Sequence, residues 1–567
     1  MTSNVGPWRA VVEALKAEGV RYVFGLPGNP KHFVYDLTEH SDIRFVLTRD
    51  EKSAVACAYA WGRLTGSPGV VFSNPGPGIT NLVTGLLEAT SGSVPLVALS
   101  NGVVQRHDGM GAFQELDSRT LMQPVTKWSH RVTDITRVPW VMQRAFTIAS
   151  NGRPGATYVE IPSDLTGTSA PMPDYVRSVP RVRMRPEPNA VKEAARLIAA
   201  ARKPTILCGG GAIVAGAYDE VQRLAERIGA AVLTTPSGRG IYAEDGPLAL
   251  GQVGLYFTTA GKKWYDESDL VIVVGSRLEA FSTNNWAFYP GSAKLIRIDN
   301  DPEALSLNWR AAVDLGGDAA LALADIDAEL ASSGYPAQTR RVEEIAGIGR
   351  RFREAAVTEA RATAHPIRPP QLLEAVNRIF GHDTVLMKEN GAADLWCYYW
   401  PYYQVLDRGD CVAMGEQTAM GMGAIGAIGA KLARPDKQVV CFIGDGAMQM
   451  AMLEIATAVE NRCGVTWVVL NNQAFGWVQY NQVLTGRPFV GTAFEQATDL
   501  AAVARAQGGH GIRLESPDKV DEAFRQAREL NAKGIPVLID AQIARHDYYK
   551  DFVEIHRSGI AKGELID

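Results

Sequence analysis

The chain has 567 residues, of which 46% are hydrophobic and 21% charged, with a formal net charge of −5. This length is too great for a single hydrophobic core, and it predicts three or four domains of an ordinary globular protein. A net charge this mild over such a length gives no reason to expect a nucleic acid or a membrane surface as a partner.

Residues 1–172 alternate between strand and helix patterns. Short apolar strands are predicted over 21–24, 43–47, 69–72 and 95–99, and helices over 8–16, 33–37, 52–64 and 80–88. A glycine–proline loop, Asn74-Pro75-Gly76-Pro77-Gly78, follows the third strand. Interleaved strands and helices predict a parallel sheet that is covered by helices on both faces.

Residues 190–330 form a second unit of the same kind. Strand 204–207 leads into Gly209-Gly210-Gly211, helix 218–228 follows, and further strands are predicted over 270–274 and 294–298. The triple glycine resembles a dinucleotide fingerprint but lacks the GxGxxG spacing. We therefore predict a Rossmann-like domain and leave its nucleotide binding open.

The last part of the chain begins after a charged stretch, 338–365, that is predicted to be a helical linker. A proline-rich boundary, 366–370, opens the third unit, which extends to 548. The polar tail, 549–567, is either a cover for a site in this unit or a disordered end.

A strand–helix–strand segment of the third unit carries the clearest chemical signal. Strand 439–443 ends in Gly444-Asp445-Gly446, a helix is predicted from 448 to about 459, and strand 465–470 ends in Asn471-Asn472. A parallel crossover brings both strand ends to one sheet edge, so Asp445 and Asn472 should lie side by side. Their oxygens suit Mg²⁺, and a helix starting just after Gly446 suits a diphosphate. The alternative is a tight turn without any ligand.

This GDG…NN pattern resembles the thiamine diphosphate (ThDP) signature of the acetolactate synthase, pyruvate decarboxylase and benzoylformate decarboxylase superfamily. The resemblance covers nearly the whole chain. It implies an α/β fold of three doubly wound parallel-sheet domains. The first (1–172) would bind the pyrimidine, the second (190–330) would be the middle domain, and the third (366–548) would bind the diphosphate. It also implies that Mg²⁺ is held by Asp445, Asn472 and the backbone carbonyl of Ala474.

The resemblance assigns further cofactor contacts. Glu51 would hydrogen-bond N1′ of the aminopyrimidine ring, although a glutamate that opens a helix is more often a surface residue. Met420 would bend the cofactor by wedging between its rings, and the carbonyl of Thr418 would meet the 4′-amino group. The remaining cofactor-binding residues would be Gly391, Gly446, Ala447 and Gly476.

The segment Gly111-Ala112-Phe113-Gln114-Glu115 resembles the GxFQE segment of acetolactate synthases. Phe113 and Gln114 are therefore expected at the reaction centre, where the Gln114 amide would donate to a developing alkoxide. The alternative is an ordinary loop glutamine. The adjacent His-His pair of pyruvate decarboxylases is absent from this region, where His107 stands alone.

One departure from the acetohydroxyacid synthase pattern follows the asparagine pair. Trp477 stands where those enzymes have Met, and Asn481 stands where they have the Trp that selects the second ketoacid. A bulky residue near the thiazolium and a polar amide on the acceptor side argue against the biosynthetic enzyme and favour a polar or oxygen-rich substrate. Alternatively, the two residues only pack against their neighbours and do not select a substrate.

The implied function is a ThDP- and Mg²⁺-dependent carboligase or lyase that acts on 2-ketoacids, pyruvate by default, or on related ketones and aldehydes. The alternatives are a 2-ketoacid decarboxylase or cyclic dione hydrolase, a ThDP/FAD oxidase with FAD in the middle domain, and a non-catalytic member of the fold. The resemblance further implies a homodimer or homotetramer in which Glu51 of one subunit meets Asp445 and Asn472 of another.

The cysteines and the first residues indicate a compartment. Six cysteines show no metal-binding spacing and lie mostly in apolar surroundings, which predicts buried, reduced thiols. No signal segment opens the chain, and no apolar run is long enough to span a membrane. We therefore expect a cytoplasmic protein.

Overall fold

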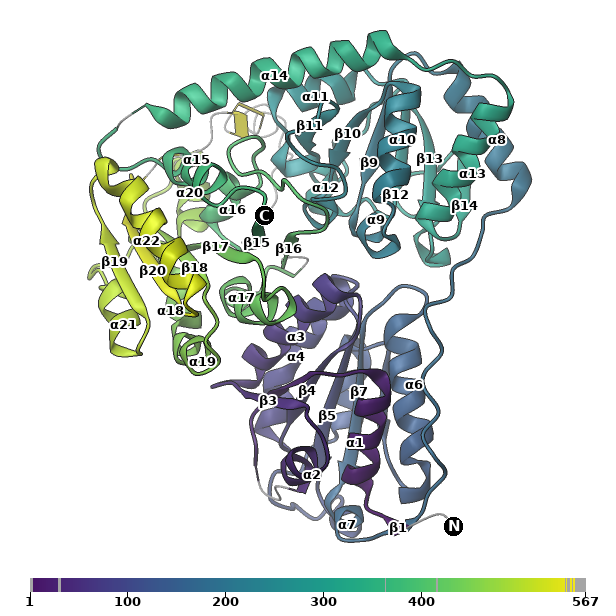
Figure 1. Cartoon of the computed structure of the whole chain (residues 1–567), viewed down its shortest axis with the longest axis vertical. Coiled ribbons are helices and arrows are strands. Elements are labelled where there is room, and N and C mark those ends of the chain that lie inside the picture. Colours follow the sequence, from purple (N-terminus) through teal and green to yellow (C-terminus); the bar gives the residue numbers. More distant parts are fainter. Residues whose placement is uncertain are drawn as a thin grey trace.

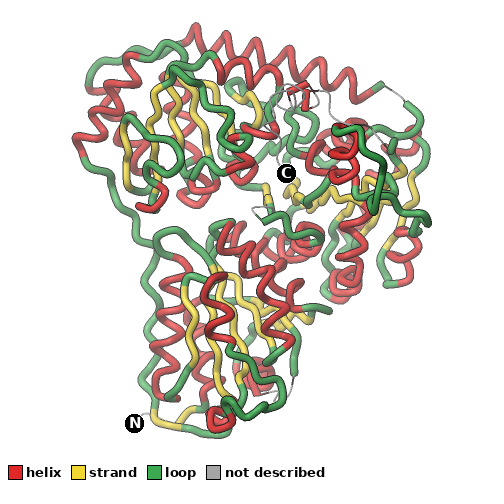
Figure 2. Tube along the Cα trace, turned by 180° about the vertical axis from the view of Figure 1, so that it is seen from behind, coloured by secondary structure: helices red, strands yellow, loops and turns green. Residues whose placement is uncertain are grey.

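The computed structural model describes residues 4–28, 32–362, 364–414, 417–545, 547, 551–552 and 554–555. These residues form three α/β domains, each built on a six-stranded parallel sheet with helices on both faces (Figure 1). Seen from behind, the three sheets are separate bodies of strands, with the N-terminal domain below the other two (Figure 2). The predicted fold class is confirmed.

The N-terminal sheet has the strand order β3-β2-β4-β5-β7-β6. Its inner strands are short, mostly apolar runs that are buried on both faces, as expected of a parallel sheet, whereas its two edge strands are only partly buried. They are β2 (Tyr22–Gly25), β3 (Arg44–Leu47), β4 (Gly69–Ser73), β5 (Leu96–Gly102), β6 (Trp128–Arg131) and β7 (Ala156–Pro162). The covering helices are α1 (Pro7–Glu18), α2 (His32–His40), α3 (Glu51–Thr65), α4 (Pro77–Ser91) and α6 (Val138–Ser150).

The central sheet has the order β11-β10-β9-β12-β13-β14, which is the 3-2-1-4-5-6 order of dinucleotide-binding folds. Its strands are β9 (Pro204–Cys208), β10 (Ala231–Thr234), β11 (Ala249–Gln252), β12 (Leu270–Val274), β13 (Lys294–Asp299) and β14 (Val313–Gly316). The main helices are α8 (Pro188–Ala200), α9 (Gly210–Ala215), α10 (Tyr218–Ile228), α11 (Thr259–Asp266) and α13 (Ala319–Ser332).

The C-terminal sheet, β16-β15-β17-β18-β20-β19, repeats the strand order of the N-terminal sheet. Its strands are β15 (Thr384–Lys388), β16 (Cys411–Ala413), β17 (Gln438–Gly444), β18 (Thr466–Asn471), β19 (His510–Leu514) and β20 (Val537–Gln542). Its helices are α15 (Pro369–Ile379), α16 (Ala392–Cys397), α17 (Met422–Ala433), α18 (Asp445–Ala451), α19 (Ile455–Glu460), α20 (Gly476–Leu484), α21 (Leu500–Ala506) and α22 (Val520–Ala532).

Two helical features join the domains. The long helix α14 (Thr339–Arg361) crosses the top of the molecule between the central and C-terminal domains (Figure 1). Helices α3 and α17 pack so closely that the N- and C-terminal sheets share one hydrophobic core. Gly429 permits this approach, because a Cβ atom there would lie 2.1 Å from the carbonyl oxygen of Cys57.

The structure corrects one predicted element. The sequence pattern predicted a single helix from Met448 to about Val459 that begins after Gly446. The structure instead starts α18 at Asp445, interrupts it with a 3₁₀ turn at Met452–Glu454, and continues with α19. Apolar spacing does not distinguish the tighter turn, because three residues of 3₁₀ helix shift the apolar stripe only slightly.

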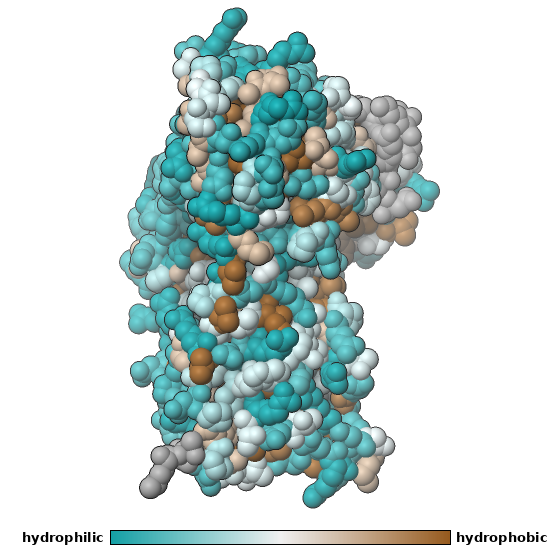
Figure 3. All heavy atoms as spheres, turned by 90° about the vertical axis from the view of Figure 1, so that its right-hand side faces the viewer, coloured by the Kyte–Doolittle hydropathy of each residue, from teal (hydrophilic) through white to brown (hydrophobic). Residues whose placement is uncertain are grey.

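The cysteines and the surface agree with a globular protein. All six cysteines are buried and free. Within the described ranges, no helix is both long and apolar enough to cross a bilayer. On the face shown in Figure 3, apolar side chains are scattered among hydrophilic ones.

Candidate active site

Asp445 and Asn472 meet at the carboxyl edge of the C-terminal sheet, as the crossover argument predicted. Strands β17 and β18 pair in parallel with Gly444 opposite Leu470, so both strands end at the same level. The backbone N–H of Asn472 lies close enough to the Asp445 carboxylate to lower its pKa. The two residues are therefore neighbours despite their distance along the chain.

The Asp445 carboxyl group lacks a full set of protein partners. The side chain is 2% exposed, and its Oδ1 has no hydrogen-bond partner among the described residues. Burial raises the pKa of Asp445 to about 7, although nearby backbone N–H groups lower it. A buried oxygen without a partner is costly, and a cation bound there would satisfy it.

The two asparagines of the pair have different surroundings. The Asn471 amide donates to Asp540 Oδ1 at 2.8 Å and accepts from the backbone N–H of Gln473, so it braces the turn. Asn472 lines a cavity, and its Nδ2 lies 3.5 Å from the carbonyl oxygen of Arg545. Only Asn472 is therefore placed to face a ligand.

A cavity of about 210 Å³ lies at this sheet edge. It is lined by Leu255, Tyr256 and Phe281 from the central domain and by residues of the C-terminal domain. Nine of the predicted site residues are among these: Gly391, Thr418, Met420, Gly446, Ala447, Asn472, Ala474, Gly476 and Trp477.

The backbone at this edge leaves space for a bound group. A Cβ atom added at Gly444 or at Gly391 would meet nothing within 4 Å, so both glycines border open space. In the described part of the chain, no three His, Cys, Asp or Glu side chains gather to bind a metal. A cation at Asp445 would therefore need the Asn472 amide, a backbone carbonyl and the oxygens of a bound diphosphate, and this donor set fits Mg²⁺-ThDP.

The structure adds contacts that the motifs did not predict. The buried Glu389 carboxylate accepts from the backbone N–H groups of Asn390, Gly421, Gly423 and Ala424 at 2.7–3.2 Å. Burial raises the pKa of this carboxyl. Glu389 thus clamps the turn after Met420 onto the loop after β15. A charged residue at the end of a buried strand was the available sequence signal.

The predicted acidic residue lies in the N-terminal domain. Glu51 is the first residue of α3 and is 8% exposed. Asn81 donates to its Oε2 at 3.0 Å, and a Cβ atom at Gly78 would lie 3.0 Å from its Oε1. Gln114 packs on the same glycine–proline loop, with its Cβ 3.0 Å from the position of a Cβ at Gly76. Glu51 and Gln114 therefore border one loop.

Five of the predicted site residues do not line the cavity within the described chain, and one of them is Asp445, whose two neighbours in the chain do line it. Glu51 and Gln114 belong to the N-terminal domain, and Phe113 is 88% exposed there. Asn481 is exposed on α20, so the predicted amide on the acceptor side is not seen in a single subunit. Their roles stay predictions.

Trp477 lines the cavity and also packs against neighbouring aromatic rings. Its ring centroid lies 6.4 Å from that of Tyr480 and 5.8 Å from that of Phe552. Phe552 belongs to the predicted tail, is 2% exposed and packs against Trp477 without lining the cavity itself. The rest of 549–567 lies outside the described residues, apart from 551, 554 and 555.

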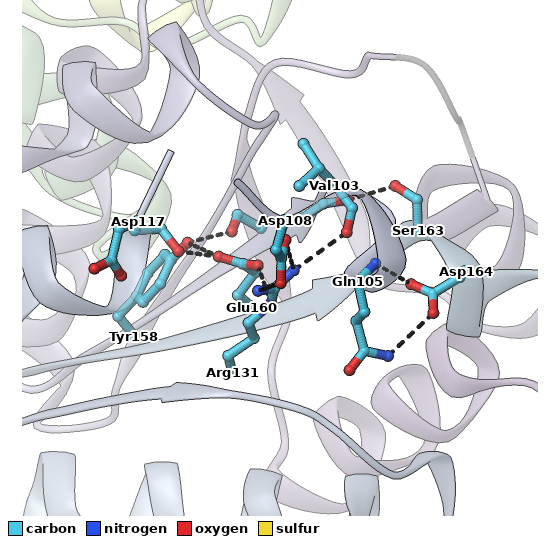
Figure 4. A network of polar contacts seen from close by, with 12 residues as sticks. Val103, Gln105, Asp108, Asp117, Arg131, Tyr158, Glu160, Ser163 and Asp164 are labelled. Carbon is cyan, nitrogen blue, oxygen red and sulfur yellow. Dashed lines mark hydrogen bonds and ion pairs between the residues drawn. The ribbon is translucent and has the colours of Figure 1, made fainter. Parts of the chain in front are cut away.

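A polar network anchors the segment that carries Phe113 and Gln114 (Figure 4). Arg131 donates to both Asp108 carboxylate oxygens, at 2.6 and 3.0 Å, and its Nε lies 2.9 Å from Glu160 Oε1. Ser118 donates to the other oxygen of Glu160. These contacts fix both ends of the segment between Asp108 and Ser118.

A second anchor lies just before this segment. The backbone N–H and side-chain amide of Gln105 donate to Asp164 at 3.0 and 3.1 Å (Figure 4). Within the segment, Glu115 accepts from the backbone N–H groups of Gly109 and Ala112. The Gln114 loop is therefore held by charged side chains on β6, β7 and α7 (Ser163–Thr166).

Family models match each of the three domains. The N-terminal TPP binding domain of thiamine pyrophosphate enzymes matches residues 8–121, the central domain matches 191–326, and the C-terminal TPP binding domain matches 391–541.

Curated relatives match along almost the whole chain. The probable acetolactate synthase large subunit of Methanococcus aeolicus is 31% identical, covering 94% of this chain and 91% of the relative. The acetolactate synthase large subunit of Haemophilus influenzae is 32% identical over 95% of both chains. The acetolactate synthase isozyme 3 large subunit of Escherichia coli is 30% identical over 94% of both chains.

Three parallel-sheet domains with a ligand cavity at the Asp445–Asn472 edge define a cofactor-dependent enzyme of the thiamine pyrophosphate class. The chain belongs to the thiamine pyrophosphate enzyme family and is a ThDP-dependent carboligase similar to acetolactate synthase large subunits.

Proposed function

We propose that this enzyme uses Mg²⁺-ThDP to join or cleave the C–C bond next to the carbonyl group of a 2-ketoacid, with pyruvate as the default donor. The observation that carries the proposal is the buried, unsatisfied Asp445 Oδ1 beside Asn472 at the edge of a cavity. Asp445, Asn472 and the carbonyl of Ala474 would hold the cation. When bound, the cofactor supplies a carbon nucleophile and takes up the electrons of the cleaved bond.

The chain's own residues would orient the cofactor and transfer protons. The backbone at Gly391, Gly446, Ala447 and Gly476 borders the space for the diphosphate, and Met420 with Thr418 borders the space for the rings. Glu51 would exchange a proton with the pyrimidine ring, because a carboxyl group within hydrogen-bond reach of a ring nitrogen can act as a general acid and base. Gln114 would donate a hydrogen bond to an alkoxide of the reacting substrate.

The site is proposed to lie between two subunits. Glu51 and Gln114 do not line the cavity of the described chain, so a second copy would have to supply them. Large apolar side chains near the same segment are exposed, notably Met110 at 73% and Phe113 at 88%. The relatives are named large subunits, which is in keeping with an oligomeric assembly, and we propose a homodimer or homotetramer. We place the enzyme in the cytoplasm.

A nucleotide is proposed for the central domain, with FAD as the first candidate. The strand order 3-2-1-4-5-6 places a cavity at the carboxyl edge of this sheet, lined by Gly210, Gly211, Gly275, Asp299 and Asp301 among others. A flavin absorption band on the purified protein would support this proposal. A colourless protein with full activity would exclude the FAD oxidase alternative.

The Glu51→Gln variant tests the proposed function. It should lose nearly all turnover of 2-ketoacids while ThDP still binds, because the amide preserves shape but cannot exchange the proton. Turnover is followed as CO₂ release and as new products by mass spectrometry, across a panel of 2-ketoacids, aldehydes and cyclic diones. The control is Glu193→Gln on the exposed face of α8. Unchanged turnover in Glu51→Gln would overturn the assignment.

A further inference from the structure

A cavity of about 320 Å³ lies at the junction of the three domains. It is found where α9 of the central domain approaches the ends of α3 and α17 (Figure 1). This junction cavity is lined by residues 62–66, 213–216 and 408–409 among others. No described residue lines both the junction cavity and the cofactor cavity, so a molecule in one would not touch the other.

Four arginines line the junction cavity, and none of the described residues around it is acidic. Arg63 comes from the N-terminal domain, Arg181 from the segment that precedes α8, and Arg408 and Arg434 from the C-terminal domain. Like charges that face one space repel one another. An anion in the cavity would relieve this repulsion.

Two of these arginines leave the cavity with a net positive charge. Arg63 donates to the carbonyl oxygen of Ser237 and has no carboxylate partner in the described chain. Arg181 shares a single carboxylate, Asp318, with Arg183, at 3.3 and 2.8 Å respectively. The Nε of Arg181 is also buried without a hydrogen-bond partner among the described residues. A buried donor without a partner is costly, and an anion in the cavity would satisfy it.

The other two arginines are only loosely paired. Arg408 contacts Asp219 at 2.5 Å, but both side chains are more than half exposed, so water and salt screen this pair. The Nε of Arg434 lies 3.9 Å from one oxygen of Asp410, whose other oxygen accepts from Lys437. Neither guanidinium group is held in a fully buried ion pair, so both can bind an added anion.

Tyr218 shows that three of the guanidinium groups lie near one another. Burial, the largest effect, and the charge of Asp410 raise the pKa of the Tyr218 hydroxyl group. The charges of Arg63, Arg434 and Arg408 lower it. Tyr218 itself lines the junction cavity, so these three positive charges act on one part of its wall.

The lining suits a phosphate group better than a carboxylate. Guanidinium groups donate in planar forks that match the oxygens of either anion. One arginine already satisfies the two oxygens and single charge of a carboxylate, whereas a phosphate ester carries nearly two charges and three acceptor oxygens. Several converging arginines therefore favour the phosphate ester. The volume of the cavity is in the range of small-ligand pockets.

We propose that the junction cavity binds a small phosphate ester, with the four lining arginines as its donors. Arg63 lies in the last turn of α3, which begins at Glu51, and Arg434 directly follows α17. A bound ester would therefore bridge the far ends of the two helices that join the N- and C-terminal domains, and it would stabilise the folded chain. The site is independent of the proposed carboligase function.

Calorimetry with glycerol phosphate tests the site on the wild-type enzyme. The titration is made at constant ionic strength with saturating ThDP, Mg²⁺ and FAD, which occupy the other two proposed sites. One glycerol phosphate should bind per chain, and the melting temperature should rise with its concentration. Malonate, which has a similar charge on carboxylates alone, should bind at least tenfold more weakly.

Two variants test the arginines. Arg63→Gln and Arg408→Gln should each weaken binding of glycerol phosphate by roughly 10- to 100-fold, as expected for the loss of a charge-assisted hydrogen bond. Arg408→Gln removes only an exposed ion pair, so its fold should be unaffected. Arg63→Lys keeps the charge without the fork and should lose less affinity than Arg63→Gln. Arg528→Gln is the matched control, because Arg528 also donates to a backbone carbonyl, that of Ile379, but does not line the cavity.

Three results would overturn the assignment. Equal affinity for malonate and glycerol phosphate would contradict the phosphate class, and unchanged affinity in both glutamine variants would contradict the role of the arginines. Binding that occurs only without FAD would assign the phosphate to the nucleotide cavity, which shares Arg181 with the junction cavity. None of these results depends on turnover of 2-ketoacids, so they leave the proposed function to its own test.

Discussion

Asp445 shows how a single buried carboxyl group can indicate a candidate cofactor site. Its Oδ1 has no protein partner in the described structure, while its neighbours on both sides are glycines that border the cavity. A protein interior seldom keeps such an oxygen unless a ligand satisfies it. The same residue is the one that the family resemblance assigns to the cation.

The Asp445→Asn variant should weaken binding of Mg²⁺-ThDP by about two orders of magnitude, because the cation loses its charged ligand. Cofactor-dependent quenching of tryptophan fluorescence measures the affinity. Asp499→Asn is the control, since Asp499 caps α21 in the same domain and asparagine caps a helix about as well as aspartate does. Equal cofactor affinity in both variants would contradict the proposed cation site.

At the scale of elements, two helices and one loop position the site. The contact of α3 with α17 ties Glu51, at the start of α3, to the turn that carries Met420 just before α17. The loop with Gln114 depends instead on the Arg131–Asp108–Glu160 network. The helix contact acts through packing and the polar network acts through charge, and both lie at some distance from the cavity.

The α3–α17 contact predicts an unequal response to glycine replacement. In Gly429→Ala the new methyl group would lie 2.1 Å from the Cys57 carbonyl oxygen, so the helices must separate. We expect the free energy of unfolding to fall by roughly 3 kcal/mol. Gly347→Ala on α14 is the control, because its Cβ would meet only the end of Arg351 at 3.5 Å. This control should be neutral or slightly stabilising in chemical denaturation.

Glu160 predicts a pH-dependent stability. Burial raises its pKa from 4.5 to about 7, although Arg131 and Tyr158 lower it and Asp108 and Asp117 add to the rise. The folded protein therefore holds this proton above pH 4.5, where the unfolded chain has lost it. Between pH 4.5 and about 7, wild type should lose up to roughly 3 kcal/mol of unfolding free energy that Glu160→Gln does not lose.

Urea denaturation of wild type and Glu160→Gln across this pH range measures the effect. As the pH rises, the stability of Glu160→Gln relative to wild type should increase, and this increase should level off above about pH 7. Parallel pH profiles for the two proteins would show that Glu160 does not titrate in this range.

At the scale of the whole molecule, the N- and C-terminal domains share one strand order and one core, yet they contribute different halves of the proposed site. The cavity is lined by Asn472 and Ala474 of the C-terminal domain, two of the proposed cation ligands, but not by Glu51. This division favours an assembly in which each subunit completes the site of another.

Mixing two inactive variants tests this arrangement. Co-expressed Glu51→Gln and Asp445→Asn subunits should regain roughly a quarter of wild-type activity, because random mixing leaves one intact site in each mixed dimer. Each variant expressed alone is the control. Co-expression without any recovery, in a protein whose dimers are shown to mix, would place both residues in the same subunit's site.

The sequence alone was sufficient for the α/β class, the family and the meeting of Asp445 with Asn472. Strands and helices follow from local apolar periodicity, and parallel crossovers have one handedness, so two strand ends can be placed side by side without coordinates.

The tertiary structure alone decided the contacts between distant segments. The four amides around Glu389, the arginines of the junction cavity and the network at Glu160 leave no periodic trace in the sequence. The 3₁₀ turn at Met452–Glu454 and the exposed position of Asn481 were likewise not predictable. Such features depend on how whole sheets and helices pack against one another, and a local pattern carries no information about that packing.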